Sequence, residues 1–130
     1  MSEFLTAEDL LVIAVNATGA QPLVRDYGLL ESAASRPQAS VFGADAYPDI
    51  WIKAAALGHS IIRNHPLLDG NERLAWVAIR TFLALNDVPP LCPDVDEAER
   101  FILEVASSEL DEVTKIAKRL RGLGGGPRVD

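Results

Sequence analysis

The sequence predicts an all-α fold, a compact domain of about six helices with a short flap or hairpin before the central helix. Apolar residues recur at helical spacing in several separate stretches, and residues that cap or break helices stand between these stretches. The chain has 130 residues, of which 48% are hydrophobic. This is enough apolar material for one sizeable core but hardly for two.

The first helix is predicted over residues 7–18. The hydroxyl of Thr6 can accept one of the unpaired amides of the first turn, and two acidic residues follow at the positive end of the helix dipole. Gly19 tolerates the left-handed conformation that ends many helices, and Pro22 cannot continue helical hydrogen bonding.

A short second helix and an irregular segment come next. Residues 25–28 are predicted to form a turn, and residues 29–35 a short helix that Pro37 stops. Residues 38–47 have no helical period and contain a glycine near the middle, which favours a loop or a small hairpin. This segment is either a plain connector or a flap whose free backbone groups could hold an extended peptide.

The two most hydrophobic helices flank one loop. Pro48 suits the first turn of the central helix, which must stop near His65 because the residue before Pro66 is pushed out of the helical region. A second apolar stripe runs from Leu74 to Leu85. The stripe on the central helix consists of Ile50, Ala54, Leu57 and Ile61, with Trp51, Ala55 and Ile62 beside it.

Two further helices complete the prediction. Asp94 or Asp96 caps a helix that extends through about Ser107, and residues 110–120 form the last helix. The basic residues near the carboxyl end of the last helix suit its dipole and are expected to form a solvated face.

Composition limits the domain organisation and the partners. Residues 1–121 are expected to form a single domain and residues 122–130 a flexible C-terminal tail rich in glycine. The formal charge of −7 and pI near 4.7 argue against direct binding to nucleic acid. A lone cysteine, the absence of a basic and apolar leader, and the absence of a long apolar span predict a cytoplasmic protein without a membrane segment.

Chemically able side chains concentrate in the loop after the central helix. A helix that begins near Asn71 points its free amides at the loop, so Gly70 and Asn71 make a local anion site. Arg73 could grip phosphate, and Asp69 supplies a hard oxygen of the kind Mg²⁺ prefers. His65 is placed to accept a proton from a hydroxyl. Together these residues favour phosphate transfer.

Each of these residues also has an ordinary structural explanation. Asp69 and Asn71 suit helix capping, and Glu72 is a favourable first-turn acid. Arg73 could pair with a surface carboxylate. Structural roles are also expected for His59 on the apolar helix, Cys92 as a small buried residue, and Trp51 and Trp76 in the core.

A family resemblance adds to this interpretation. Residues 65–73, HPLLDGNER, resemble the signature of the Fic/Doc family, which runs His, any residue, Phe, any residue, an acid, Gly or Ala, Asn, Gly or Lys, and Arg. The similarity spans about residues 10–88 and is closest to the Doc, or death-on-curing, branch. The flanking segments that carry it are residues 27–33, 36–38, 47–48, 53–56 and 60–66.

The resemblance implies a compact helical toxin that is inhibited when an amphipathic segment of its cognate, Phd-like antitoxin folds against it. Doc toxins use ATP and Mg²⁺ to phosphorylate a threonine of elongation factor Tu, which halts translation, whereas Fic relatives mostly transfer AMP. By position, His65 would be the catalytic base and Asp69 would hold Mg²⁺. Residues 38–47 would be the flap that aligns the target, with an apolar groove beside it for the antitoxin. The phosphates would be bound by Gly70, Asn71, Glu72 and Arg73, partly through backbone amides.

The sequence departs from the family pattern at three positions. Leu67 replaces the usual Phe at little expected cost, and Leu74 stands where Doc proteins usually have Thr. Glu72 stands where Doc has Lys and Fic has Gly, and its charge should repel bound phosphates by on the order of a few kcal/mol in a partly buried site. Two hypotheses follow. The first is an active or weakly active kinase-type toxin. The second is a catalytically impaired protein of the same fold, either an attenuated toxin or a protein in which Glu72 engages the neighbourhood of Arg73 and blocks the phosphate site, and which acts mainly by binding a partner.

Overall fold

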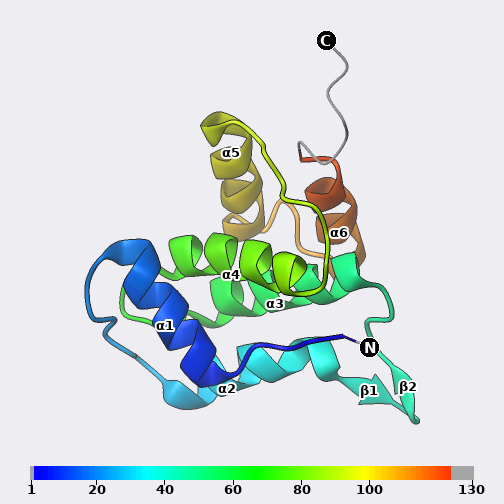
Figure 1. The fold of residues 1–130 in the computed structure, drawn as a ribbon, viewed down its shortest axis with the longest axis horizontal. Coiled ribbons are helices and arrows are strands. Elements are labelled where there is room, and N and C mark those ends of the chain that lie inside the picture. The colour runs from blue at the N-terminus through cyan, green and yellow to red at the C-terminus, as the bar shows by residue number, and fades with distance from the viewer. Residues whose placement is uncertain (1, 124–130) are drawn as a thin grey trace.

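The computed structural model describes residues 2–123 and confirms the all-α prediction (Figure 1). Within these residues six α-helices are joined by short connections, and a two-stranded hairpin precedes the central helix. In chain order the elements are α1 (Ala7–Thr18), α2 (Tyr27–Ser35), a 3₁₀ turn (Arg36–Gln38), β1 (Ser40–Val41), β2 (Ala44–Asp45), α3 (Ile50–Asn64), α4 (Asn71–Leu85), α5 (Val95–Ala106) and α6 (Val113–Arg121).

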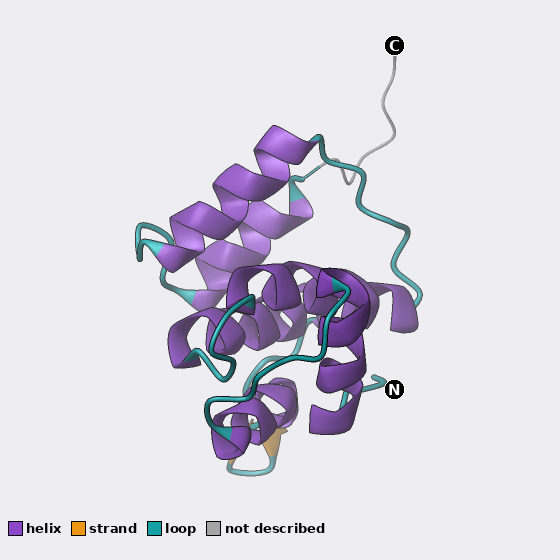
Figure 2. Cartoon of the chain, turned by 90° about the vertical axis from the view of Figure 1, so that its left-hand side faces the viewer, coloured by secondary structure: helices purple, strands orange, loops and turns teal. Residues whose placement is uncertain are grey.

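The helices α3 and α4 form the centre of the molecule. The short loop between them reverses the chain, and α3 packs most extensively against α4 and α6 (Figure 1). In that view α1 lies on the left and slants down from the level of α4, α2 lies below the pair, and α5 and α6 lie above it. Figure 2 shows the same arrangement of helices from one end. None of the helices in the described part of the chain is long and apolar enough to cross a membrane.

Small residues let α3 and α4 approach closely. Ala54, Ala55 and Ala56 are completely buried on α3. A methyl group added at Gly58 would lie only 2.9 Å from Cγ1 of Ile79, so this position on α3 accepts little more than hydrogen. Trp51 and Trp76 are half-buried and pack against the same core, as predicted.

Capping side chains set several of the helix boundaries. The reciprocal capping box of Thr6 and Asp9 starts α1 where the sequence predicted. The predicted turn over residues 25–28 is wrong in its second half, because Asp26 accepts the Leu29 amide at 3.1 Å and α2 begins at Tyr27. Of the two candidate caps for α5, Asp94 is the one used.

The last part of the described chain differs from the prediction in two places. The helix α6 begins at Val113, three residues later than expected, because Ser108 takes a left-handed conformation with φ 68° and the chain turns there. Leu123 is buried in the core, so the described start of the expected tail packs against the protein. The remainder of the predicted tail, residues 124–130, lies outside the described residues.

One burial prediction is wrong. Cys92 was expected to be a small buried residue, but it is exposed on the extended connection between α4 and α5. Prolines on both sides favour an extended chain that runs over the surface, and no helical face turns the thiol inward.

The sequence predicted either a loop or a small hairpin for residues 38–47, and the structure shows the hairpin. Val41 pairs with Ala44 in an antiparallel register, and Phe42 and Gly43 both have positive φ, of 52° and 80°, as a tight two-residue hairpin turn requires. The buried Lys53 of α3 donates to a carboxylate oxygen of Asp45 at 3.1 Å and holds the hairpin beside the start of that helix.

Candidate active site

His65 ends α3 and begins the loop that connects it to α4. Its backbone has φ 50° and ψ 59°, a left-handed conformation that costs a non-glycine residue roughly 1–2 kcal/mol. The His65 amide still bonds to the Ile61 carbonyl at 3.2 Å. The residue is exposed, and its nearest polar contact is a marginal 3.5 Å from Nδ1 to the Arg63 carbonyl. The imidazole can therefore reach a solvent-borne hydroxyl group.

A second segment, distant in sequence, supports this loop. The backbone of residues 23–26 runs antiparallel to residues 66–68 and forms a short bridge with them, centred on Val24 and Leu67. The hydrogen bonds are Leu68 N to Leu23 O at 2.9 Å, Arg25 N to Pro66 O at 2.7 Å and Asp26 N to Pro66 O at 3.1 Å. The connection between α1 and α2 therefore fixes the start of the loop between α3 and α4.

The Arg25 side chain adds two bonds that sequence reasoning missed. Its Nε donates to the His65 carbonyl at 2.7 Å, and its Nη2 donates to the Asn64 carbonyl at 2.6 Å. Forty residues separate Arg25 from His65, and Arg25 belongs to no capping or periodic pattern. No local sequence signal singles this residue out.

The start of α4 is built to receive a negative charge. Gly70 is the cap residue with φ 85°, and no side chain within residues 2–123 caps the amides of the first turn. The leading amides of a helix have no partner within the helix, so residues 71–73 present N–H groups to the loop. Asp69 is exposed beside them, and its Oδ1 accepts the Gly70 amide at 2.9 Å.

The side chain of Asn71 serves the loop itself. Its Oδ1 accepts the Leu67 amide and its Nδ2 donates to the Leu67 carbonyl, both at 2.9 Å, and the residue is only 8% exposed. An amide bound in both directions is held rigidly. The side chain of Asn71 is therefore occupied within the loop, which leaves its backbone N–H to meet an anion.

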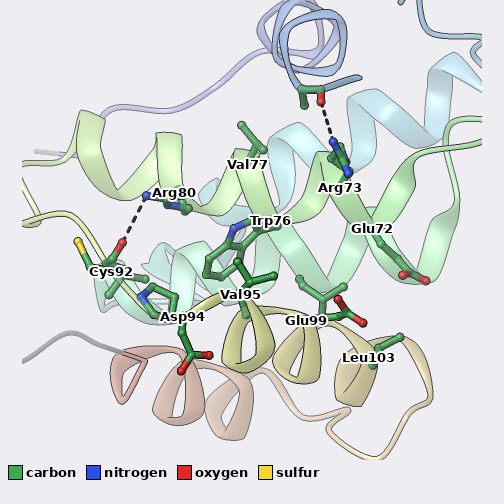
Figure 3. A pocket seen from close by; sticks show the side chains of 15 residues that line it. Glu72, Arg73, Trp76, Val77, Arg80, Cys92, Asp94, Val95, Glu99 and Leu103 are labelled. Atoms are coloured by element: carbon green, nitrogen blue, oxygen red, sulfur yellow. Dashed lines mark hydrogen bonds between the residues drawn. The ribbon is translucent and has the colours of Figure 1, made fainter. Parts of the chain in front are cut away.

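Arg73 and Glu72 point in different directions from α4 (Figure 3). Arg73 is exposed, and its Nη1 donates to the Ala17 carbonyl at the end of α1 at 3.2 Å. Glu72 is also exposed, and its carboxylate forms no ion pair with Arg73 among residues 2–123. The negative charge at this position is therefore not neutralised by its neighbour.

A groove runs from this end of α4 along the gap to α5 (Figure 3). Its floor and walls are mainly apolar, and Arg80 closes one side by donating to the Leu91 carbonyl at 3.3 Å. None of its lining residues belongs to the hairpin segment 38–47. This apolar groove lies between α4 and α5, and the groove expected beside the flap stays a prediction. Its apolar lining includes Trp76, Val77, Val95, Ala98, Ile102 and Leu103.

The hairpin lies beside the start of α3 (Figure 1), whereas His65 caps the other end of that helix. Fifteen residues of helix separate the two, a length of about 22 Å at 1.5 Å per residue. This position does not support the expected role of residues 38–47 in aligning a target at His65. The segment that adjoins the loop is residues 23–26.

The site offers few protein ligands for a metal ion. Among the residues that the structure describes, no three histidine, cysteine or acidic side chains gather in one place. Mg²⁺ commonly takes one or two carboxylates and completes its shell with phosphate oxygens and waters. The exposed carboxylate of Asp69, next to free helix amides, fits a metal that arrives together with a nucleotide.

Comparison with known proteins agrees with this geometry. The family model described as Fic/DOC matches residues 4–83, which include both the loop and the segment that supports it. The chain belongs to the Fic/Doc family. It is also 50% identical over 123 residues to Toxin Doc of Mycolicibacterium smegmatis (strain ATCC 700084 / mc(2)155), a match that covers 94% of each chain. Membership of the Fic/Doc family implies a transferase.

Proposed function

We propose that this protein is a Doc-type toxin that transfers a phosphoryl group from ATP to a threonine hydroxyl of elongation factor Tu in the cytoplasm and so inhibits translation. The observation that carries the proposal is the exposed imidazole of His65 on the same short loop as the uncapped start of α4. The Fic/Doc signature lies on this loop, and the half-identical relative is named as a toxin.

In this proposal the nucleotide phosphates lie at the first turn of α4. The amides of residues 71–73 and the positive end of the helix dipole attract the anion. Arg73 has donors left beyond the one bound to Ala17 and can pair with a phosphate oxygen. Asp69 would hold Mg²⁺, which supplies charge neutralisation for the transferring phosphoryl group.

The chemical step requires one proton acceptor. His65 takes the proton of the threonine hydroxyl as its oxygen forms a bond to the γ-phosphorus. The bond from that phosphorus to the β–γ bridging oxygen breaks, and ADP leaves with the electron pair. Adenylyl transfer would use the same base but form the bond at the α-phosphorus, with pyrophosphate leaving. The orientation of ATP in the site decides between the two reactions.

The groove between α4 and α5 is the proposed binding place of the antitoxin. An amphipathic helix buries its apolar face in such a groove. Two large apolar residues on its rim, Val95 and Leu103, are 78% and 49% exposed. A segment of a Phd-like antitoxin that covered them would also lie next to Glu72 and Arg73, and so close to the nucleotide.

Glu72 favours a second candidate function. An unneutralised carboxylate in the first turn of α4 opposes the phosphates that the neighbouring amides attract. If this repulsion dominates, the protein is a catalytically impaired member of the family that acts by binding its partner.

Radiolabelled ATP distinguishes these candidates. Purified elongation factor Tu is incubated with the protein and with ATP labelled at either the γ- or the α-phosphate, and His65→Ala serves as the control. We expect label from the γ-position only, a mass gain of one phosphoryl group on the target, and loss of the signal in the variant. Label from the α-position would establish adenylyl transfer, and no label above the variant background would favour the impaired protein.

A further inference from the structure

The side chain of Arg25 closes the carboxyl end of α3. Its Nε and Nη2 bond to the carbonyls of His65 and Asn64 at 2.7 and 2.6 Å, so one planar guanidinium spans two consecutive residues. The Arg25 backbone amide also bonds to the Pro66 carbonyl at 2.7 Å. One residue therefore holds three consecutive carbonyls, on both sides of the imidazole-bearing residue.

These bonds act where the helix itself provides none. The last carbonyls of a helix have no partner within it and carry the negative end of the dipole, so a guanidinium binds them strongly. His65 also sits in a left-handed conformation that the surrounding structure must enforce. The ring direction depends on this backbone, since among the described residues the side chain has only the marginal contact to the Arg63 carbonyl.

We propose that Arg25 is a positioning residue for His65. Arg25 holds the imidazole of His65 toward the start of α4 and does not touch the substrate itself. This inference rests on the proposed function, in which His65 is the base. Two of the guanidinium nitrogens face protein carbonyls, so the role of Arg25 is to hold the backbone of the base.

Substitution tests the role through the separation of kcat from KM. Arg25→Gln removes both the charge and the pair of guanidinium donors that spans two carbonyls. We expect kcat for transfer to fall about ten- to a hundredfold, as for a base displaced by about 1 Å. The KM for ATP should stay within about twofold. Arg25→Lys keeps the charge but can reach only one carbonyl well, so it should restore part of the lost kcat.

Arg63→Gln is the matched control. It removes a guanidinium from the same end of α3, but the Arg63 side chain faces Ser108 and Asp111 rather than the loop. We expect it to keep most of the wild-type kcat. A loss in Arg63→Gln equal to that in Arg25→Gln would assign the effect to general charge near the helix end and would overturn the proposal. So would a raised KM for ATP with kcat preserved in Arg25→Gln, because that pattern describes a substrate ligand.

Hydrogen exchange tests the same point without catalysis. The exchange rate of the His65 amide in the full chain should rise by about tenfold or more in Arg25→Gln, the factor expected when a hydrogen bond to a charged group is lost. Amides in the middle of α4 should keep their rates. If the wild-type protein transfers nothing, the proposed function fails, but this measurement still decides whether Arg25 holds the loop. Unchanged exchange at His65 overturns the inference, and Arg25→Lys is used for both measurements if Arg25→Gln does not fold.

Discussion

Glu72 places a negative charge beside the amides that are proposed to bind phosphate. The side chain is exposed and unpaired with Arg73, so solvent screens part of the repulsion but no neighbour cancels it. We predict that Glu72→Lys lowers the dissociation constant of ATP by about tenfold and raises the rate of target modification, since the change adds attraction as it removes repulsion. Calorimetric titration with ATP and magnesium measures the first effect directly.

Two variants separate this effect from a change in overall charge. Glu72→Gln removes the repulsion without adding attraction. It should give about half of the gain in ATP affinity that Glu72→Lys gives, on a logarithmic scale. Glu31→Lys makes the same charge reversal on the exposed surface of α2 and should leave ATP affinity within about twofold. Equal affinity in Glu72→Lys and the wild-type protein would remove the electrostatic argument at this position.

His59 is a structural residue, as the sequence predicted, but its partners come from distant parts of the chain. Arg36 lies 2.8 Å from Nδ1 and can only donate, so Nδ1 is the acceptor and the proton resides on Nε2. That nitrogen lies 2.9 Å from Asp111 and donates to it. The bond holds the connection before α6 against α3.

The hydrogen bond from His59 lowers the pKa of the Asp111 carboxyl below its usual value, with a further contribution from nearby Arg63. A lowered folded-state pKa means that the folded protein binds fewer protons than the unfolded chain, so this contribution to stability is present near neutral pH. It is lost as the pH falls through the lowered pKa. We predict that Asp111→Asn is less stable than wild type at neutral pH and that the difference shrinks below about pH 4.

Urea unfolding at several pH values checks this prediction. The carboxylate is half exposed, so the difference between the two proteins should be modest throughout. Asp96→Asn, an exposed acid in the first turn of α5, provides a comparison with no histidine partner. A gap between Asp111→Asn and wild type that widened in acid would contradict the assigned direction.

The chemistry of the loop could be predicted from the sequence because it is local. His65, Asp69 and Gly70 lie within six residues, and the proline after His65 and the glycine before α4 define the turn between two helices. Two details could not be predicted. The side chain of Asn71 is hydrogen-bonded to the backbone of Leu67, and Arg25 bonds to the loop from the connection between α1 and α2. Both contacts depend on how the chain packs in three dimensions.

At the scale of an element, the contact between α3 and α4 depends on Gly58. A methyl group there would lie within van der Waals distance of Ile79, which is almost fully buried and has little room to move. We predict that Gly58→Ala destabilises the protein by about 1–3 kcal/mol, despite the better helix propensity of alanine. The urea midpoint should fall with an unchanged slope.

Two further proteins test the cause of that loss. Gly122→Ala makes the same change where the new methyl would meet only ordinary contacts, at 3.5 Å or more, and should alter stability by less than about 0.5 kcal/mol. The double variant Gly58→Ala with Ile79→Val removes one of the opposing carbon atoms. The double variant should lose less unfolding free energy than the two single variants lose together. If the two losses simply add, the clash is absent.

Helix positions were predictable wherever capping and periodicity agreed. The bounds of α1 match the prediction because Thr6 and Gly19 signal both ends. The starts of α2 and α3 are set by Asp26 and Asp49, whose side chains accept amides of the first turn. Proline was the stronger signal in the sequence for α3, yet Pro48 lies outside the helix and the aspartate after it is the cap.

At the scale of the whole molecule, the sequence predicted which elements exist better than where they lie. The family resemblance implied that residues 38–47 align the target beside the base, but the hairpin and His65 flank opposite ends of α3. The sequence predicted only a turn at residues 25–28, whereas residues 23–26 form a bridge to the loop after His65. Pairing between segments forty residues apart depends on how α1, α2 and α3 pack. Local sequence patterns do not predict this packing.

The position of the groove makes a prediction about the whole assembly. If the antitoxin segment binds between α4 and α5, Leu103→Glu places a charge on an exposed apolar rim and should weaken the complex by at least about tenfold, with little effect on folding or on transfer by the free toxin. Phe42→Glu is the informative comparison, because Phe42 is fully exposed at the tip of the hairpin, where the sequence alone would place the partner. Calorimetry should show this weaker binding in the first variant and the wild-type affinity in the second. The reverse result would return the antitoxin to the hairpin, about 22 Å of helix away from the proposed base, and inhibition would then have to act at a distance rather than by covering the nucleotide.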